Sequence, residues 1–176
     1  MDTGRTDQAD YSLRVIGRIR TPFLHATGAP IQPAYAEGAE GTVLVEDRYA
    51  AALGDIEGFE RLWLLYWMDR VAPGSFRPRL VPYRDTQERG LFATRSPCRP
   101  NPIGLSVVRL LGRQGAVLRV ADVDMLDDTP LIDIKPYAPE FDAHPNSRAG
   151  WLEARTVDRR VADDRFHGAG APKRKR

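Results

Sequence analysis

The sequence predicts a mainly β protein, a barrel or a sandwich with short helices and an irregular C-terminal extension. Short stretches of strand character recur along most of the 176 residues, separated by turn residues. No glycine-rich turn joins a strand to a helix, and no succession of crossover helices is present, which argues against a doubly wound nucleotide fold. With 42% hydrophobic residues and a mean hydropathy of −0.43, the chain can bury the core of one domain.

The first predicted strand covers residues 13–20, where apolar residues and glycine alternate with arginines until Thr21-Pro22 ends the pattern. Residues 23–41 form an arm rich in Gly, Pro and Ala, and its length indicates a functional loop or local disorder. A second strand is expected over residues 42–46. Asp47 then resembles the N-cap of a short helix that ends at Leu53, before Gly54.

The run Leu62–Met68 is continuously apolar and rich in aromatic residues, which is typical of a central strand buried on both faces. Further strands are expected over residues 90–94, 105–111 and 116–123, with Gly112–Gly115 as a hairpin loop between the last two. The predicted organisation is therefore a flexible N-terminus (1–12), one β domain (13–140), a short C-terminal extension (141–168) and a basic tail (169–176).

The composition argues against a membrane-spanning, secreted, disulfide-bonded or metal-binding protein. No window approaches the roughly 18 apolar residues that span a membrane, and the first residues lack the apolar block of a secretion signal, so a cytoplasmic location is expected. The single Cys98 cannot form an intramolecular disulfide. The three histidines are scattered, so no metal site is expected.

The formal net charge of +2 conceals an asymmetry, because Lys173–Arg176 alone carry four positive charges. Such a tail is either a solvated end or an attractor of phosphates. Between residues 77 and 119, nine arginines face only Asp85 and Glu88. This section is either a basic face for RNA or a solvated surface of strands.

Two segments concentrate rigid and ionisable residues. In Phe92–Leu105, Pro97, Pro100 and Pro102 each fix φ and remove a backbone donor, so this proline loop is stiff and its arginines and amide are available to a ligand. Arg99 and Asn101 are the predicted substrate-binding residues. A plain turn between two strands is the alternative. The second segment, Asp124–Tyr137, favours a functional interpretation of both.

These two segments, with Val15–Pro22, Gln32-Pro33 and Ile56–Leu65, resemble the TsaA-like family, which includes the TrmO enzymes that methylate N6 of threonylcarbamoyladenosine beside the tRNA anticodon. The resemblance covers residues 13–140. It implies a single-sheet β-barrel methyltransferase that uses S-adenosylmethionine, acts on position 37 of tRNA and holds the cofactor at a homodimer interface. The C-terminal domain of the better-known bacterial members is not expected here.

The resemblance also implies positions for the cofactor contacts. They fall in the arm, after the central strand, beside the proline loop and at the start of the second segment: Gln32, Pro33, Ala34, Asp69, Arg70, Arg95, Leu105, Met125, Leu126, Asp127 and Asp128. This chain departs from the family pattern at Asp69-Arg70 and at Asp128, so the adenosine contacts there are expected to differ.

Methyl transfer from a sulfonium requires alignment of the nucleophile with the methyl carbon and exclusion of water. The stiff proline loop could contribute to both requirements. The N6 nitrogen is a weak nucleophile that must lose a proton, so a general base is expected. Asp124, Asp127 and Asp133 are candidates, although Asp133 equally fits the outer face of a strand. Lys135 or Tyr137 would hold a substrate carboxylate or phosphate.

The roles of the aromatic residues, of Cys98 and of the whole protein each have an alternative. Trp63, Tyr66 and Trp67 are expected in the core rather than stacked on bases. A covalent role for Cys98 is not favoured, since no histidine lies near it in the sequence. The alternative functions are a non-catalytic barrel that binds S-adenosylmethionine or RNA, and a methyltransferase for a different acceptor.

Overall fold

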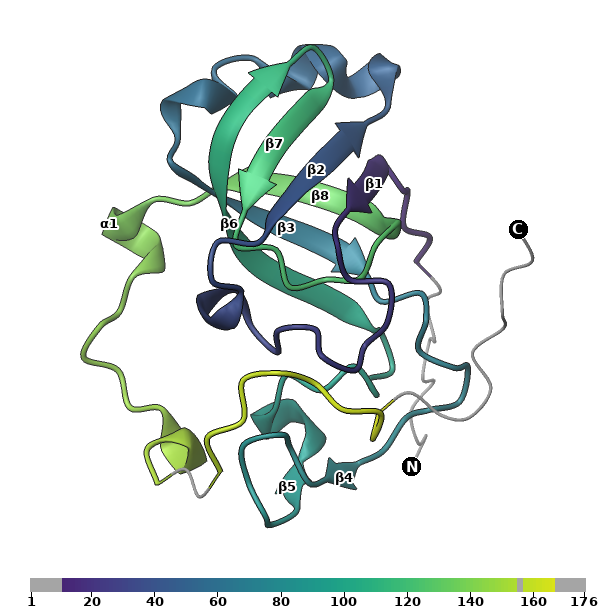
Figure 1. Cartoon of the computed structure of the whole chain (residues 1–176), viewed down its shortest axis with the longest axis vertical. Helices are drawn as coiled ribbons and strands as arrows, with labels where there is room; N and C mark the ends of the chain where they lie inside the picture. Colours follow the sequence, from purple (N-terminus) through teal and green to yellow (C-terminus); the bar gives the residue numbers. More distant parts are fainter. Residues whose placement is uncertain (1–10, 155–156, 167–176) are drawn as a thin grey trace, which may run out of the picture.

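A closed antiparallel β-barrel forms the centre of the molecule (Figure 1). The computed structural model describes residues 11–154 and 157–166. Neighbours around the barrel follow the order β1-β2-β7-β6-β3-β8. The strands are β1 (Gly17–Arg20), β2 (Glu40–Val45), β3 (Arg61–Trp67), β6 (Ile103–Gln114), β7 (Val117–Ala121) and β8 (Thr129–Pro136). The predicted mainly β, single-sheet barrel with short helices is confirmed.

The remaining elements are short. A two-stranded sheet pairs β4 (Arg79–Leu80) with β5 (Arg89–Gly90) below the barrel. The helical turns are η1 (Pro33–Tyr35), η2 (Asp47–Leu53), η3 (Ile56–Gly58), η4 (Leu91–Ala93), α1 (Pro139–Asp142) and η5 (Gly150–Leu152). None of the helices in the described ranges has the length and hydropathy needed to cross a bilayer. Residues 169–176, predicted to be a basic tail, lie outside the described residues.

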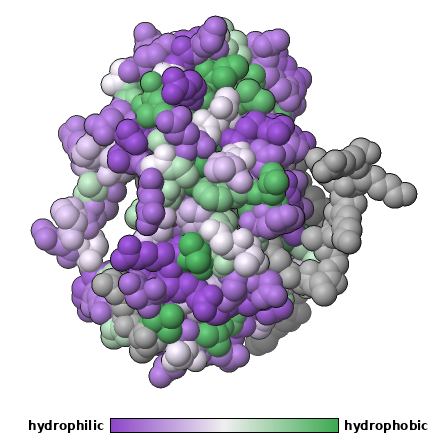
Figure 2. Space-filling view, viewed as in Figure 1, coloured by the Kyte–Doolittle hydropathy of each residue, from purple (hydrophilic) through white to green (hydrophobic). Residues whose placement is uncertain are grey.

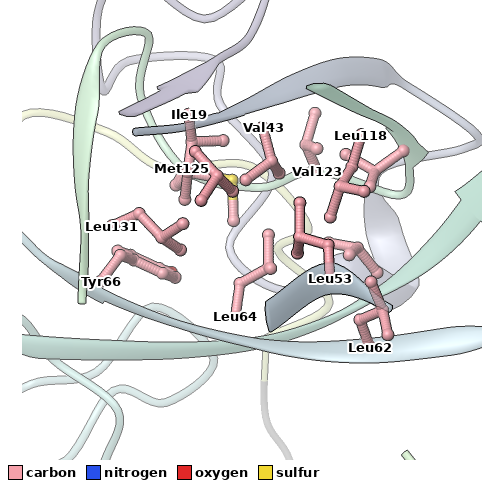
Figure 3. Close-up of a cluster of buried hydrophobic side chains, with 13 residues drawn as sticks. Ile19, Val43, Leu53, Leu62, Leu64, Tyr66, Leu118, Val123, Met125 and Leu131 are labelled. Atoms are coloured by element: carbon pink, nitrogen blue, oxygen red, sulfur yellow. The ribbon is translucent and has the colours of Figure 1, made fainter. Parts of the chain in front are cut away.

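The core fills the barrel because every strand sends alternate side chains inward (Figure 3). Ile19, Val43, Leu64, Leu118 and Leu131 come from five different strands and are fully buried. Closure of the sheet leaves the barrel without unpaired edges. The side chains of one continuous cluster therefore hold together strands that are far apart in the sequence.

The prediction that the central apolar run is buried on both faces is wrong. In β3, Leu62, Leu64 and Tyr66 are buried inside the barrel, whereas Trp63, Leu65 and Trp67 alternate with them and are only half-buried on the outside. An antiparallel strand with apolar residues on both faces has the same sequence pattern as a buried parallel strand. Only Tyr66 of the three aromatic residues is in the core.

Four boundaries also differ from the prediction. The first strand begins at Gly17 rather than residue 13, and residues 90–94 hold the end of β5 and η4 rather than one strand. The segment after Glu46 is a 3-10 helix in which Glu46, not Asp47, occupies the N-cap. Strand β6 continues to Gln114 through an irregularity between Leu110 and Gly112, so the expected hairpin loop is shorter.

A second apolar cluster lies outside the barrel and uses the end of the described chain. Phe166 packs with Leu80, Leu91 and Cys98 in this cluster. The segment 157–166 also pairs with the arm, since the Ala162 amide donates to the Ala29 carbonyl at 2.8 Å. The C-terminal extension therefore ties the arm to the proline loop.

One glycine permits an unusually close approach inside the barrel. A Cβ at Gly104 would lie 2.0 Å from Cε2 of the Tyr66 ring, which is far inside van der Waals contact. The ring therefore occupies the space where any other residue would place a side chain. This position lets the Tyr66 hydroxyl reach Ser106, two residues further along β6, at 3.0 Å.

We expect Gly104→Ala to lower the free energy of unfolding by about 2 kcal/mol or more, because the added methyl group must displace a buried ring. Gly58→Ala is the matched control, since a Cβ at Gly58 meets no atom within 4 Å and should change stability by less than about 0.5 kcal/mol. Urea denaturation of both variants measures the difference. Equal midpoints would contradict the proposed contact.

Candidate cofactor pocket and active site

The proline loop and the loop 124–128 meet at one end of the barrel because of strand pairing. Strand β3 lies between β6 and β8 and is antiparallel to both. The end of β3 therefore lies beside the beginnings of its neighbours, with Trp67 opposite Ile103 and Tyr66 opposite Leu131. The proline loop leads into β6, and loop 124–128 leads into β8. Both segments must converge on the residues that follow β3.

A pocket of about 330 Å³ lies at this convergence, within the size range of small-molecule sites. Four segments line most of it, and Tyr66 and Tyr83 add to its surface. These segments are the arm (including Gln32), the residues after β3 (Met68, Asp69, Arg70 and Val71), the proline loop with the start of β6 (Thr94, Arg95, Pro97, Arg99, Ile103, Gly104 and Leu105), and the second motif (Asp124, Met125, Leu126 and Thr129). Ala162 of the C-terminal extension completes the wall.

The proline loop is held by its own polar groups. Arg99 Nη1 donates to the Thr94 carbonyl at 2.9 Å, and its guanidinium lies 5.5 Å from the centre of the Phe92 ring. The Pro102 carbonyl accepts from the Met68 amide at 2.8 Å, which joins the loop to the end of β3. Arg99 lines the pocket, whereas Asn101 is exposed and does not. Cys98 is buried in the second cluster.

Loop 124–128 is fastened to the end of β1. The Asp127 carboxylate accepts from Arg20 Nε at 2.9 Å and from the Thr21 amide at 3.1 Å. The Asp127 carbonyl accepts from Arg70, whose Nη1 is buried without a hydrogen-bond partner among the described residues. Asp128 lies 3.9 Å from both Arg18 and Arg20. Neither Asp127 nor Asp128 lines the pocket, so their carboxylates organise the loop.

The arm and the proline loop are joined across the pocket by Arg95, which donates from Nη1 to Oε1 of Gln32. Pro33 and Ala34 lie in a second cavity along the outer face of β6. The two cavities share Gln32, Arg95 and Leu105. Of the predicted cofactor residues, the structure therefore brings seven to the main pocket and places Pro33 and Ala34 beside it.

Three of the predicted catalytic residues lie elsewhere. Asp133, Lys135 and Tyr137 follow β8 away from the pocket, with Lys135 opposite Trp63 and the Tyr137 amide bonded to the Arg61 carbonyl at the start of β3. Lys135 Nζ pairs with Asp133 at 2.8 Å, and the Tyr137 ring lies 6.0 Å from Trp63. The structure gives these three no contact with the pocket.

Asp124 is a half-buried carboxylate in the pocket wall, and the Ser106 hydroxyl contacts it. Ser106 Oγ donates to Asp124 Oδ1 at 2.6 Å, and Tyr66 lies behind Ser106. Burial raises the pKa of Asp124 to about 7, against the opposing effects of the Ser106 hydrogen bond and the nearby Arg95 charge. Burial and the Asp124 charge also raise the pKa of Tyr66, which therefore stays protonated.

The sequence interpretation missed the polar role of Ser106 and Tyr66. Both are at inward positions of their strands, between Gly104 and Val108 in one case and after Leu64 in the other. A serine at an inward position of an otherwise apolar strand was the available signal, because a buried hydroxyl needs a partner. That partner, Asp124, follows a different strand and could not be paired from sequence alone.

We expect Asp124→Asn to gain stability relative to the wild type as the pH rises from 5 to 8. Because the pKa is raised to about 7 in the folded state, the unfolded carboxyl is ionised over most of this range while the folded one stays protonated, so the wild type loses stability until the pH passes about 7. The amide of the Asp124→Asn variant does not titrate, so the stability of the variant has no such pH dependence. The difference between the unfolding free energies should change by about 2 kcal/mol. A difference that is constant with pH would show that Asp124 titrates normally.

Comparison with known proteins agrees with this architecture. Residues 18–143 match the model of the tRNA-methyltransferase O N-terminal domain. The chain is 51% identical over 141 residues to a probable S-adenosyl-L-methionine-binding protein of Pyrococcus abyssi, covering 80% of this chain and 75% of that protein. It is 33% identical over 154 residues to the tRNA (adenine(37)-N6)-methyltransferase of Escherichia coli K12, covering 83% of this chain and 66% of that enzyme.

A solved structure shares the fold as well as the sequence. The crystal structure of TrmO from Pseudomonas aeruginosa superimposes with a TM-score of 0.70 at 35% identity, covering 86% of this chain and 65% of that one. The chain thus spans about two thirds of the length of these bacterial relatives. From the matched domain, the shared barrel and the identities, the chain belongs to the tRNA-methyltransferase O family.

Proposed function

We propose that this protein is a methyltransferase that uses S-adenosylmethionine and acts on N6 of threonylcarbamoyladenosine at position 37 of tRNA. The observation that carries the proposal is the convergence of two stiff segments on one pocket that also contains a desolvated carboxylate. The Pyrococcus relative is named as a binder of S-adenosylmethionine and the E. coli relative as a methyltransferase of adenine 37. Both names support the assignment.

The pocket residues fit S-adenosylmethionine. Met68, Ile103, Leu105 and Leu126 offer apolar surface for an adenine ring. Arg70 Nη1 is a buried donor that has no hydrogen-bond partner within residues 11–154 and 157–166, and a carboxylate such as that of the methionyl group would satisfy it after a small adjustment. Asp69 is exposed at the pocket wall and suits a sulfonium or a ribose hydroxyl. The contact between Arg95 of the proline loop and Gln32 of the arm would close the site.

The bound cofactor supplies an activated methyl group. The protein residues align the two reactants and exclude water from the site. The proline loop has few accessible conformations, so little entropy is lost when it orients the two reactants. Tyr66 and Ser106 are buried behind Asp124, so water is excluded from the inner side of this carboxylate. Two exposed arginines suit the phosphates of an RNA loop, namely Arg95 in the pocket wall and Arg77, whose amide donates to the Cys98 carbonyl of the proline loop.

The proposal is tested with the purified chain, S-adenosylmethionine and tRNA that carries or lacks the threonylcarbamoyl group. We expect saturable cofactor binding by calorimetry and methyl transfer only to the modified tRNA, with the product nucleoside identified by mass spectrometry. Equal methylation of unmodified tRNA would remove the proposed substrate. Cofactor binding without transfer to any tRNA would favour a non-catalytic binding protein.

We also infer that the protein acts as a homodimer. The outer face of β3 and β6 carries three apolar cross-strand pairs, Trp63 with Val107, Leu65 with Leu105 and Trp67 with Ile103. Leu105 and Ile103 are 47% and 39% exposed, and both also line the pocket. Contiguous apolar surface of this kind is typical of an interface. A partner on this face would lie directly beside the cofactor.

The segment after β8 does not close over the body of the protein. It stands away from the barrel and leaves an opening in the space-filling view (Figure 2). Apolar residues on that view form scattered patches within a largely hydrophilic surface. The three apolar pairs of β3 and β6 carry the inference, and the occupant that we propose for this face is a second protomer.

We expect Leu65→Lys to convert a dimer into a monomer, because it places a charge at the centre of the three apolar pairs. Light scattering coupled to gel filtration measures the mass. Leu44→Lys is the control, since Leu44 is 39% exposed on β2, which does not pair with β3 or β6. A wild-type mass equal to one chain would contradict the dimer.

A further inference from the structure

We propose that Asp124 accepts the N6 proton of the substrate and that Ser106 and Tyr66 position this carboxylate through a chain of hydrogen bonds from inside the barrel. This inference rests on the proposed function and names the groups that would move the proton. Asp124 is assigned as a catalytic residue because it lines the pocket, and Ser106 and Tyr66 as residues that act through it.

The three residues come from different parts of the barrel. Tyr66 belongs to β3, Ser106 to β6, and Asp124 to the loop before β8. The two oxygen–oxygen distances are 3.0 Å from Tyr66 to Ser106 and 2.6 Å from Ser106 to Asp124. Ser106 is 1% exposed and Tyr66 is 7% exposed, so water does not compete for these bonds. The chain runs from the barrel interior to the pocket.

The direction of the hydrogen bonds follows from the number of protons. A serine hydroxyl has one hydrogen, and the carboxylate oxygen can only accept it. Ser106 therefore donates to Asp124, and its oxygen is left to accept from Tyr66. The phenol can serve as this donor because burial and the charge of Asp124 keep it protonated. A tyrosine that donates to a serine makes that serine a stronger donor.

The other candidate carboxylates are less suited to accept a proton. Asp127 is bonded to Arg20 and the Thr21 amide, so its charge is already compensated. Asp133 is paired with Lys135 on the outer face of β8. Asp69 lines the pocket but is exposed to water, which solvates its carboxylate. Asp124 is instead shielded from water and accepts a hydrogen bond from Ser106. The cation that faces it is Arg95, and the titratable group that faces it is Tyr66.

The proton transfer balances with the methyl transfer. The N6–H bond breaks and its proton moves to an Asp124 oxygen, while the N6 lone pair forms a bond to the methyl carbon. The bond between this carbon and sulfur breaks, and its electrons remain on sulfur, which becomes a neutral thioether. Asp124 returns its proton to solvent after product release. A carboxyl group with a pKa of about 7 can accept and release a proton near neutral pH.

The first test is single-turnover methylation of threonylcarbamoylated tRNA at saturating cofactor. We expect Asp124→Asn to lower the rate constant by about 100-fold to 10,000-fold, the usual contribution of general base catalysis. The amide oxygen of this variant still accepts from Ser106, so cofactor affinity measured by calorimetry should change little. Asp133→Asn tests the competing carboxylate and should keep the wild-type rate. The reverse pattern overturns the assignment.

The second test separates positioning from mere structural support. The Ser106 hydrogen bond lowers the pKa of Asp124, so Ser106→Ala should move the rising limb of the rate–pH profile to higher pH. Tyr66→Phe keeps the ring beside Gly104 and should shift the limb less, in the same direction. Tyr49→Phe, on η2, is the matched control. A loss of rate without any movement of the limb contradicts the hydrogen-bond chain.

The proposal fails separately from the proposed function. If the wild type methylates the modified tRNA and Asp124→Asn retains its rate within threefold, the function stands and Asp124 is not the base. If the wild type transfers no methyl group, the function and the base assignment both fail. The hydrogen-bond chain is still tested without substrate by carboxyl carbon NMR, in which Ser106→Ala must raise the pKa of Asp124. An unchanged pKa overturns the chain.

Discussion

The antiparallel pairing of β3 with both β6 and β8 is the constraint on which the rest of the structure depends. A strand that is antiparallel to both neighbours must end where they begin. Any segment that leads into β6 or β8 is therefore delivered to the same end of the barrel. The proline loop and loop 124–128 occupy these two connections, and the pocket is the space between them.

The same pairing explains why a polar group is tolerated inside the barrel at this end. Most inward positions carry aliphatic side chains, but Tyr66 and Ser106 lie together on neighbouring strands next to the pocket. Gly104 makes the space for the Tyr66 ring, and Asp124 completes the hydrogen bonds. A carboxyl whose pKa is raised in the folded state lowers stability once the pH exceeds its unfolded pKa, and strongly shifted pKa values of this kind are found mainly at functional sites.

The stiff loop is supported from outside the barrel as well. Phe166 packs against Leu91 and Cys98, and the segment before it pairs with the arm. Arg165 strengthens this contact by pairing with Asp163 at 2.7 Å and donating to the Pro82 carbonyl. The residues after the barrel thus help to build the pocket, although their sequence has no obvious periodicity.

The sequence by itself determined the mainly β class, the family resemblance and the two segments that form the pocket, because these depend on local patterns and on residue types. It could not distinguish the two faces of β3, since both are apolar, and it left Asp124, Asp127 and Asp133 together as candidate bases, with Asp133 fitting the outer face of a strand equally well. Tertiary structure separated them. Asp127 contacts Arg20 and Asp133 contacts Lys135, whereas Asp124 contacts Ser106 in the pocket. These contacts depend on which strands become neighbours when the barrel closes, and that choice is made by packing between residues distant in the chain.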